Sequence, residues 1–378
     1  MSAPFARSSA SIATPPRIHD TRRERLPRGA RPRRDVAPTS WAKSESANPT
    51  TTKTTRLPAP TVHPASVPTR AHLIRGGAAS SAAASSGESS PLGVHALVWT
   101  GGWSAADAND ACARTAAAGY DIIEIPLLNP RAVDVEMTRN ALGTHGLRVA
   151  TSLGLSFDAD VSSDDASCVA RGNALLDEAL DVSVGIGATH MCGILYSALG
   201  KYPRRATSRG YRNAVAAIKR LAKRAAERSD VALGLEVVNR YETNLLNTAT
   251  QAMAFLNDVD EPNVVIHLDT YHMNIEERSL EAAVLECGDR LGYVHVGESD
   301  RGALGSGNVD FDSLFRGLAR VHYRGPITFE SFSGDVVSPD LSDVLCIWRN
   351  PWGFEQRDEL ASDARSFVLG MMDKHGLR

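Results

Sequence analysis

Acidic and imidazole side chains stand at the ends of four successive apolar runs in the second half of this chain. They are Glu236, Asp269, His295 and Glu330. The intervals between them are 33 (269−236), 26 (295−269) and 35 (330−295) residues. One strand-plus-helix unit takes roughly 30 residues, so each interval spans about one such unit. The spacing predicts four consecutive strand–helix units, each with a chemically active side chain at its strand end.

The same alternation of short apolar runs and amphipathic stretches covers residues 93–378 and gives eight strand–helix pairs. The expected strands are 94–98, 121–127, 148–155, 189–195, 233–239, 264–269, 293–297 and 327–330. The expected helices are 104–118, 133–145, 162–185, 208–229, 248–258, 279–288, 311–321 and 356–375. A count of eight in a segment near the typical ~250 residues predicts an α/β fold, a single (β/α)8 TIM barrel.

A doubly wound open sheet also alternates strands and helices. It would not bring the ends of strands five to eight around one point, whereas a barrel gathers them at one face. The first expected strand is not followed by the glycine pattern of a dinucleotide site. The strand ends therefore favour closure.

Composition changes near residue 92. Residues 1–92 are rich in Ser, Thr, Ala, Pro and Arg and poor in acidic and large apolar residues. Such a segment buries too little surface to offset the entropy of ordering, so we expect a disordered N-terminal extension. Its arginines also resemble an organelle transit peptide, but an untargeted extension of a cytoplasmic protein is the preferred interpretation.

Charge and cysteine content exclude several classes of partner. The formal net charge is −3, which gives no electrostatic basis for binding nucleic acid or an anionic membrane. No apolar run approaches the ~18 residues of a transmembrane helix. The five cysteines are scattered without the short spacing of a zinc or redox motif, so free thiols in a reducing compartment are expected.

Three carboxylates and one imidazole at neighbouring strand ends form a hard, mostly oxygen ligand set. Such a set suits Mn²⁺, Mg²⁺ or Co²⁺. A single strand-end Glu or His is usually a surface group, but equivalent positions on consecutive units favour a metal site. Glu242, His272 and Arg301 follow three of these residues closely, in what we expect to be loops at the same mouth. As a set they suggest anchors for a polyhydroxylated ligand; singly, they would be read as surface ion-pair partners.

Three segments carry a specific resemblance. Residues 235–242 (LEVVNRYE), 267–277 (HLDTYHMNIEE) and 295–301 (HVGESDR) resemble the ketose 3-epimerase family, the D-tagatose and D-allulose (psicose) 3-epimerases. These proteins belong to the xylose-isomerase-like TIM barrels. The resemblance runs from about Val94 to the C-terminus, and residues 1–92 have no counterpart in it.

The resemblance implies a metal-dependent isomerase that acts on a small-molecule ketose. One divalent ion, Mn²⁺ by preference and otherwise Co²⁺ or Mg²⁺, would be held by Glu236, Asp269, His295 and Glu330. The two glutamates would form the catalytic acid/base pair, and Glu242, His272 and Arg301 would bind substrate oxygens. The family also implies a homodimer or homotetramer.

Some positions depart from the family or leave alternatives open. Ser331-Phe332 stands where the family often has Pro-Phe, and Trp99 to Trp103 is either a substrate wall or core. The loop 302–307 is read as a plain loop and not as a phosphate cradle. A hydroxypyruvate isomerase and an inosose dehydratase share the ligand set, but the Glu242, His272 and Arg301 trio matches the epimerases better. A silent sugar-binding barrel is the non-enzyme alternative, and the presence of both Glu236 and Glu330 argues against it. An endonuclease IV-like enzyme would need more histidines and a basic groove.

Deletion of residues 1–90 is expected to leave folding and activity intact, because the predicted barrel begins after this segment. Thermal unfolding and turnover of the truncated and full-length proteins provide the measurement. Loss of the cooperative transition in the truncated protein would place the boundary elsewhere.

Overall fold

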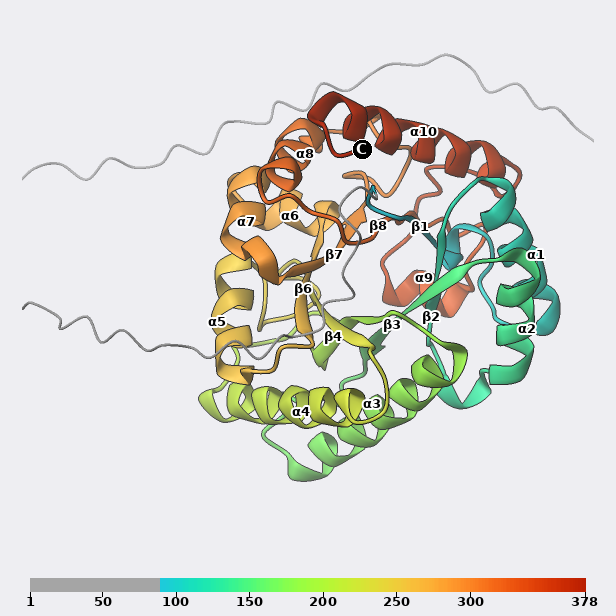
Figure 1. Cartoon of the computed structure of the whole chain (residues 1–378). Helices are drawn as coiled ribbons and strands as arrows, with labels where there is room; N and C mark the ends of the chain where they lie inside the picture. Colours follow the sequence, from blue (N-terminus) through green and yellow to red (C-terminus); the bar gives the residue numbers. More distant parts are fainter. Residues whose placement is uncertain (1–88) are drawn as a thin grey trace, which may run out of the picture. The chain divides into compact units, whose positions relative to one another are not determined.

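Eight parallel strands close into a barrel in the computed structural model, which describes residues 89–378 (Figure 1). The strands pair in sequence order and the first pairs with the last, with Leu92 opposite Ile327. Their bounds are β1 Leu92–His95, β2 Ile122–Pro126, β3 Arg148–Leu155, β4 His190–Ala198, β5 Ala232–Val237, β6 Val264–Asp269, β7 Leu291–Val296 and β8 Ile327–Phe329. The prediction of a TIM barrel is confirmed.

Helices surround the barrel, as Figure 1 shows. They are α1 Ala105–Ala117, α2 Val135–His145, α3 Ala166–Ile186, α4 Ser208–Ala226, α5 Ala249–Val259, α6 Thr270–Glu276, α7 Leu280–Cys287, α8 Phe311–Arg320, α9 Pro339–Val344 and α10 Arg357–His375. Side-chain caps mark several starts: Ser104 and Asp107 form a capping box on α1. Gly146, Gly187 and Gly376 end α2, α3 and α10 in the left-handed conformation.

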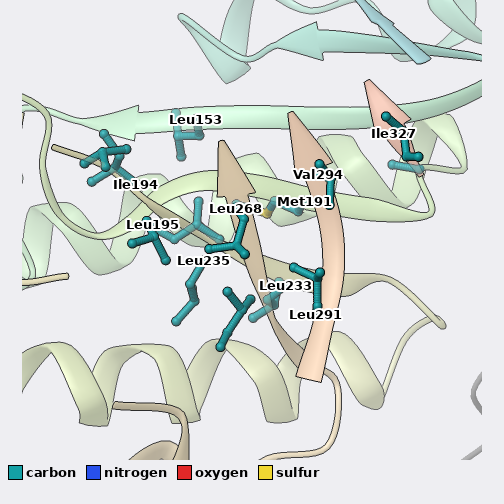
Figure 2. Close-up of a cluster of buried hydrophobic side chains, with 14 of the residues drawn as sticks. Leu153, Met191, Ile194, Leu195, Leu233, Leu235, Leu268, Leu291, Val294 and Ile327 are labelled. Carbon is teal, nitrogen blue, oxygen red and sulfur yellow. The ribbon is translucent and has the colours of Figure 1, made fainter. Parts of the chain in front are cut away.

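Strand residues alternate between two environments, as the period of two requires. One set packs outward against the helices and forms the main core; Figure 2 shows part of it, where Leu233, Leu268 and Val294 from neighbouring strands lie together. The other set points into the barrel. There Ile122, Ala150, Cys192 and Tyr293 form a small separate cluster. The next inward positions toward the carboxyl end are polar: Glu124 follows Ile122 on β2, and His295 follows Tyr293 on β7.

The first expected strand is wrong at both ends. β1 begins at Leu92 and stops at His95, and residues 96–98 form a 3₁₀ turn. The cause is local, because the His95 Nδ1 accepts a hydrogen bond from the Leu97 N–H at 3.2 Å and caps this turn. Two short helices, α6 and α9, were not predicted. α6 follows β6 directly, and the carboxylate of Asp269 caps it by accepting from the Tyr271 N–H.

The five cysteines all lie in the described part of the chain and none forms a disulfide. Four are buried, and Cys346 is exposed. Burial raises the pKa of the Cys112 thiol to about 11 and that of Cys287 to about 12. Residues 1–88 lie outside the described residues, and with them nearly all of the predicted extension. Among residues 89–378, no helix combines the length and apolar composition that crossing a membrane requires.

Gly93→Ala is expected to destabilise the barrel, because a Cβ at this position would lie 2.3 Å from Thr328 Oγ1. Overpacking of this kind costs about 1–3 kcal/mol. The matched control is Gly143→Ala on the exposed face of α2, where nothing lies within 4 Å. That change should raise stability by up to about 1 kcal/mol. Denaturant unfolding measures both, and equal effects of the two substitutions would contradict the packing argument.

Candidate active site

The four predicted ligand residues lie at the carboxyl end of the barrel strands. Glu236 is the second-last residue of β5, Asp269 ends β6, His295 is on β7, and Glu330 directly follows β8. Asp269 and His295 are register partners in neighbouring strands. Because inward positions alternate along each strand, these polar side chains reach the barrel interior from its four last strands.

Asp269, His295 and Glu330 converge closely enough to share one cation. One ligand atom from each lies within 4.8 Å of the other two. The His295 Nδ1 is 3.5 Å from Asp269 Oδ2 and 3.3 Å from Glu330 Oε1. Glu236 belongs to two overlapping groups, one with Asp269 and His272 and one with His267 and His295. Asp269 and His295 each share one group with Glu236 and one with Glu330, while no single group among the described residues contains both glutamates.

The chemistry of this centre fits a divalent cation. Asp269 Oδ2 and His295 Nδ1 are buried and have no hydrogen-bond partner. Buried polar atoms are almost always paired, so two such atoms aimed at one point indicate a missing positive partner. Carboxylate oxygens with one imidazole nitrogen match the preferences of Mn²⁺ and related ions.

His272 and Glu242 are linked through Asn239, a residue that the sequence analysis did not single out. The Asn239 Nδ2 lies 2.8 Å from His272 Nδ1 and donates to Glu242 Oε1 at 3.0 Å. The backbone N–H of Asn239 also donates to His272 Nδ1. A neutral ring then carries its proton on Nε2, which lies 3.5 Å from Glu236 Oε1. His272 lies on α6, so its prediction as a loop residue was wrong.

Arg301 is held in place by aromatic rings. Its guanidinium carbon lies 3.8 Å from the centre of the Tyr271 ring and 4.7 Å from that of Phe332. The guanidinium also pairs with the Glu330 carboxylate. The backbone of Arg301 has a φ of 63°, in the left-handed region that residues with a side chain seldom adopt. Such a conformation persists only where the surrounding structure fixes it.

Two polar groups fix the loop that carries Arg301. The buried Glu298 carboxylate accepts from the N–H groups of Ser299, Gly305 and Val309. The Ser331 hydroxyl donates to the Arg301 carbonyl and accepts from the Trp352 indole N–H. Ser331 thus has a structural role. The Gly305 N–H is already bonded to a carboxylate, which favours a plain loop over a phosphate cradle.

The two glutamates of the centre have pKa values displaced in opposite directions. Burial raises the pKa of Glu330 to about 8, with Asp269 and Glu236 adding to the effect against the attraction of His295 and Arg301. The pKa of Glu236 is lowered, because its hydrogen bond to His272 and the nearby imidazoles outweigh burial.

Three polar residues of the barrel interior, Glu124, His95 and His267, were not predicted from the sequence. Glu124 on β2 is fully buried, and its Oε2 lies 2.7 Å from His295 Nε2. His267 on β6 stands edge-on to the His295 ring, with 4.1 Å between ring centres. The sequence did contain an indication, because each of these residues is polar and interrupts an otherwise apolar strand. Glu124, for example, is two residues after Ile122 and therefore points to the same side of β2.

The predicted tryptophan wall divides into two parts. Trp99 is buried, and its indole N–H donates to Thr115 on α1, so this residue is core. Trp103 lines a cavity of about 380 Å³. Leu97 and Leu128, beyond the ends of β1 and β2, line it too. The cavity therefore lies at the same end of the barrel strands as the ligand residues.

Comparison with known proteins agrees with this geometry. The family model described as "Xylose isomerase-like TIM barrel" matches residues 112–362. The L-ribulose 3-epimerase of Methylomonas sp. (strain DH-1) is 54% identical over 73% of this chain and 96% of its own length. The ketose 3-epimerase of Arthrobacter globiformis is 49% identical, over 73% and 95% of the two chains. A crystal structure of D-allulose 3-epimerase from Methylomonas sp. in complex with D-allulose superposes with a TM-score of 0.73 and 52% identity, covering 75% of this chain and 97% of that one.

A closed parallel barrel with acidic and imidazole side chains at its carboxyl end defines a xylose isomerase-like TIM barrel enzyme. Within that class, this chain belongs to the ketose 3-epimerase family of carbohydrate isomerases.

Asp269→Asn is expected to weaken Mn²⁺ binding by more than the about 10–100-fold typical of losing an outer partner of a metal ligand. His272→Ala and Arg301→Ala should retain one tightly bound ion, because neither is in the Asp269–His295–Glu330 group. Calorimetric titration of the metal-stripped proteins measures this. Loss of the ion in His272→Ala would instead favour the alternative group of Glu236, Asp269 and His272.

Proposed function

We propose that this protein inverts the configuration at C3 of a free ketose. Glu236 and Glu330 would exchange protons with opposite faces of the sugar. They would also hold one divalent ion, Mn²⁺ by preference, together with Asp269 and His295. The main support for this proposal is the position of the two glutamates. One lies on β5 and the other follows β8, on either side of the Asp269–His295 pair of β6 and β7.

The reaction requires removal of a proton next to a carbonyl group. When bound, the cation supplies Lewis-acid polarisation of the C2 carbonyl and makes the C3 proton more acidic. One glutamate takes that proton as the C3–H electron pair moves toward C2 and O2. The other glutamate then donates a proton to C3 from the opposite face. A single base would tend to return the proton to its own face, so inversion calls for two.

Surrounding side chains would hold and orient the sugar. Arg301 presents donors from a fixed position between Tyr271 and Phe332, and Glu242 and His272 offer a linked pair of polar groups. Preorganised donors of this kind stabilise charge that develops on a substrate oxygen. The cavity beside Trp103 offers room for the carbon chain beyond C3. The relatives named above support a five- or six-carbon ketose, and the family resemblance supports a dimer or tetramer.

A panel of free ketoses, incubated with Mn²⁺-loaded protein and analysed for C3 epimers, tests the proposal. The ribulose/xylulose, allulose/fructose and tagatose/sorbose pairs form the panel. Epimerisation of at least one pair, abolished by metal removal and restored by Mn²⁺, is the expected result. No epimer from any ketose, with isomerisation of hydroxypyruvate instead, would replace the proposal with the hydroxypyruvate isomerase alternative.

Glu236→Gln and Glu330→Gln should each reduce epimerisation by at least the about 10²–10⁴-fold that a general acid/base contributes. Each variant keeps the base of one face, so in deuterated water it should exchange the C3 proton of one epimer without inverting it. Glu286→Gln, at an exposed glutamate of α7, is the matched control and should turn over normally. Metal content is measured in every sample. Near-normal epimerisation by both metal-loaded variants would exclude the two-glutamate mechanism.

A further inference from the structure

The buried glutamate of β2 stands between two imidazole rings. Glu124 Oε2 lies 2.7 Å from Nε2 of His295 on β7, and Glu124 Oε1 lies 3.7 Å from Nε2 of His95 on β1. The Glu124 side chain is completely buried, so water does not compensate its charge. An ionised carboxylate in this position is retained only if its neighbours supply the compensation.

The orientation of His295 decides which of its nitrogens can serve as a ligand. Its Nδ1 points at Asp269 Oδ2 and Glu330 Oε1 and has no hydrogen-bond partner. To offer a lone pair there, a neutral ring must carry its proton on Nε2. That N–H needs an acceptor, and Glu124 Oε2 is the atom in reach. Carboxylates that accept from the outer nitrogen of a metal-binding histidine fix its tautomer and raise its basicity.

His95 supports Glu124 from the other side. Its Nδ1 accepts the Leu97 N–H, so its own proton lies on Nε2. That Nε2 faces both the Ser152 hydroxyl at 3.2 Å and the free oxygen of Glu124. The His95 ring also meets Phe332 edge-on, with 5.6 Å between ring centres. His95 on β1 and His295 on β7 thus each face one oxygen of the carboxylate.

We propose that Glu124 is a positioning residue, which fixes the tautomer and ring orientation of His295 so that Nδ1 is available to the divalent cation. Glu124 belongs to none of the residue groups that could hold the cation, and it does not line the cavity beside Trp103. Its effect passes through His295 alone. The inference rests on the cation of the proposed function and not on the identity of the ketose.

Glu124→Gln is the primary test. The side chain keeps its shape, and its amide oxygen can still accept from His295, but the negative charge is lost. We expect the Mn²⁺ dissociation constant of the metal-stripped full-length protein to rise about 10–100-fold, as losses of such outer partners do. The weakening should persist across the pH range in which the protein is folded. Saturating Mn²⁺ should restore most of the turnover, because the residue does not contact substrate.

Two further variants separate positioning from simple packing. Ser152→Ala removes the other partner of His95 while leaving the Glu124–His295 bond in place, and it should bind Mn²⁺ as the wild-type protein does. Glu124→Asp retains the charge on a side chain one methylene shorter, which draws it away from His295, and it should also bind the ion at least tenfold more weakly. This variant supplies the test if Glu124→Gln does not fold, as judged by thermal unfolding without metal.

The inference would be overturned if Glu124→Gln bound Mn²⁺ with a dissociation constant within twofold of that of the wild-type protein. If only Glu124→Asp folds, the same criterion applies to that variant. Equal weakening in Ser152→Ala would also overturn it, since a general packing defect would then suffice. Failure of the proposed function gives a different pattern. In that case the wild-type protein would epimerise no ketose, yet Glu124→Gln would still bind Mn²⁺ more weakly.

Discussion

Mutual repulsion among buried carboxylates is the constraint around which the barrel interior is organised. Glu124, Asp269 and Glu330 are buried on or directly after β2, β6 and β8, and the half-buried Glu236 on β5 shares ligand groups with Asp269 and His295. Burying several negative charges together is unfavourable unless positive groups or hydrogen bonds offset them. The Arg301 guanidinium pairs with Glu330, and the imidazoles of His272 and His295 face Glu236 and Glu124, so these groups supply part of the compensation. The buried Asp269 Oδ2 has no hydrogen-bond partner.

The need to offset the charge of Glu330 also bears on the loop after β7, which carries Arg301. Arg301 must lie beside Glu330, yet its backbone adopts a left-handed conformation to place it there. Glu298 in the same loop, Ser331 and Phe332 after β8, and the ring of Tyr271 on α6 hold this arrangement. The cost of the unusual φ is of order 1–3 kcal/mol, and it is offset by contacts made outside the charged centre.

The barrel fold and the four strand-end residues could be predicted from the sequence, because the spacing of the apolar runs determines both. The eight strands and the four strand-end residues follow from spacing, and a closed barrel necessarily brings those ends together. What escaped prediction depended on contacts between distant segments or on caps. β1 stops early because the His95 ring bonds to a nearby N–H, and α6 starts because Asp269 caps it. Glu124 was missed because its importance appears only when β2 and β7 face each other across the barrel.

The five cysteines differ in their accessibility to thiol reagents. Four thiols are buried, and burial raises the pKa of three of them, Cys112, Cys192 and Cys287, which keeps them protonated and shielded from reagents. Cys346 alone is exposed, in the segment after α9. Its neighbours Leu345 and Ile347 pack on a cluster that includes Phe332, one of the two rings against Arg301. A maleimide dye or a solid support would therefore attach at one defined point. The same thiol makes an immobilised enzyme of uniform orientation attainable without engineering the sequence.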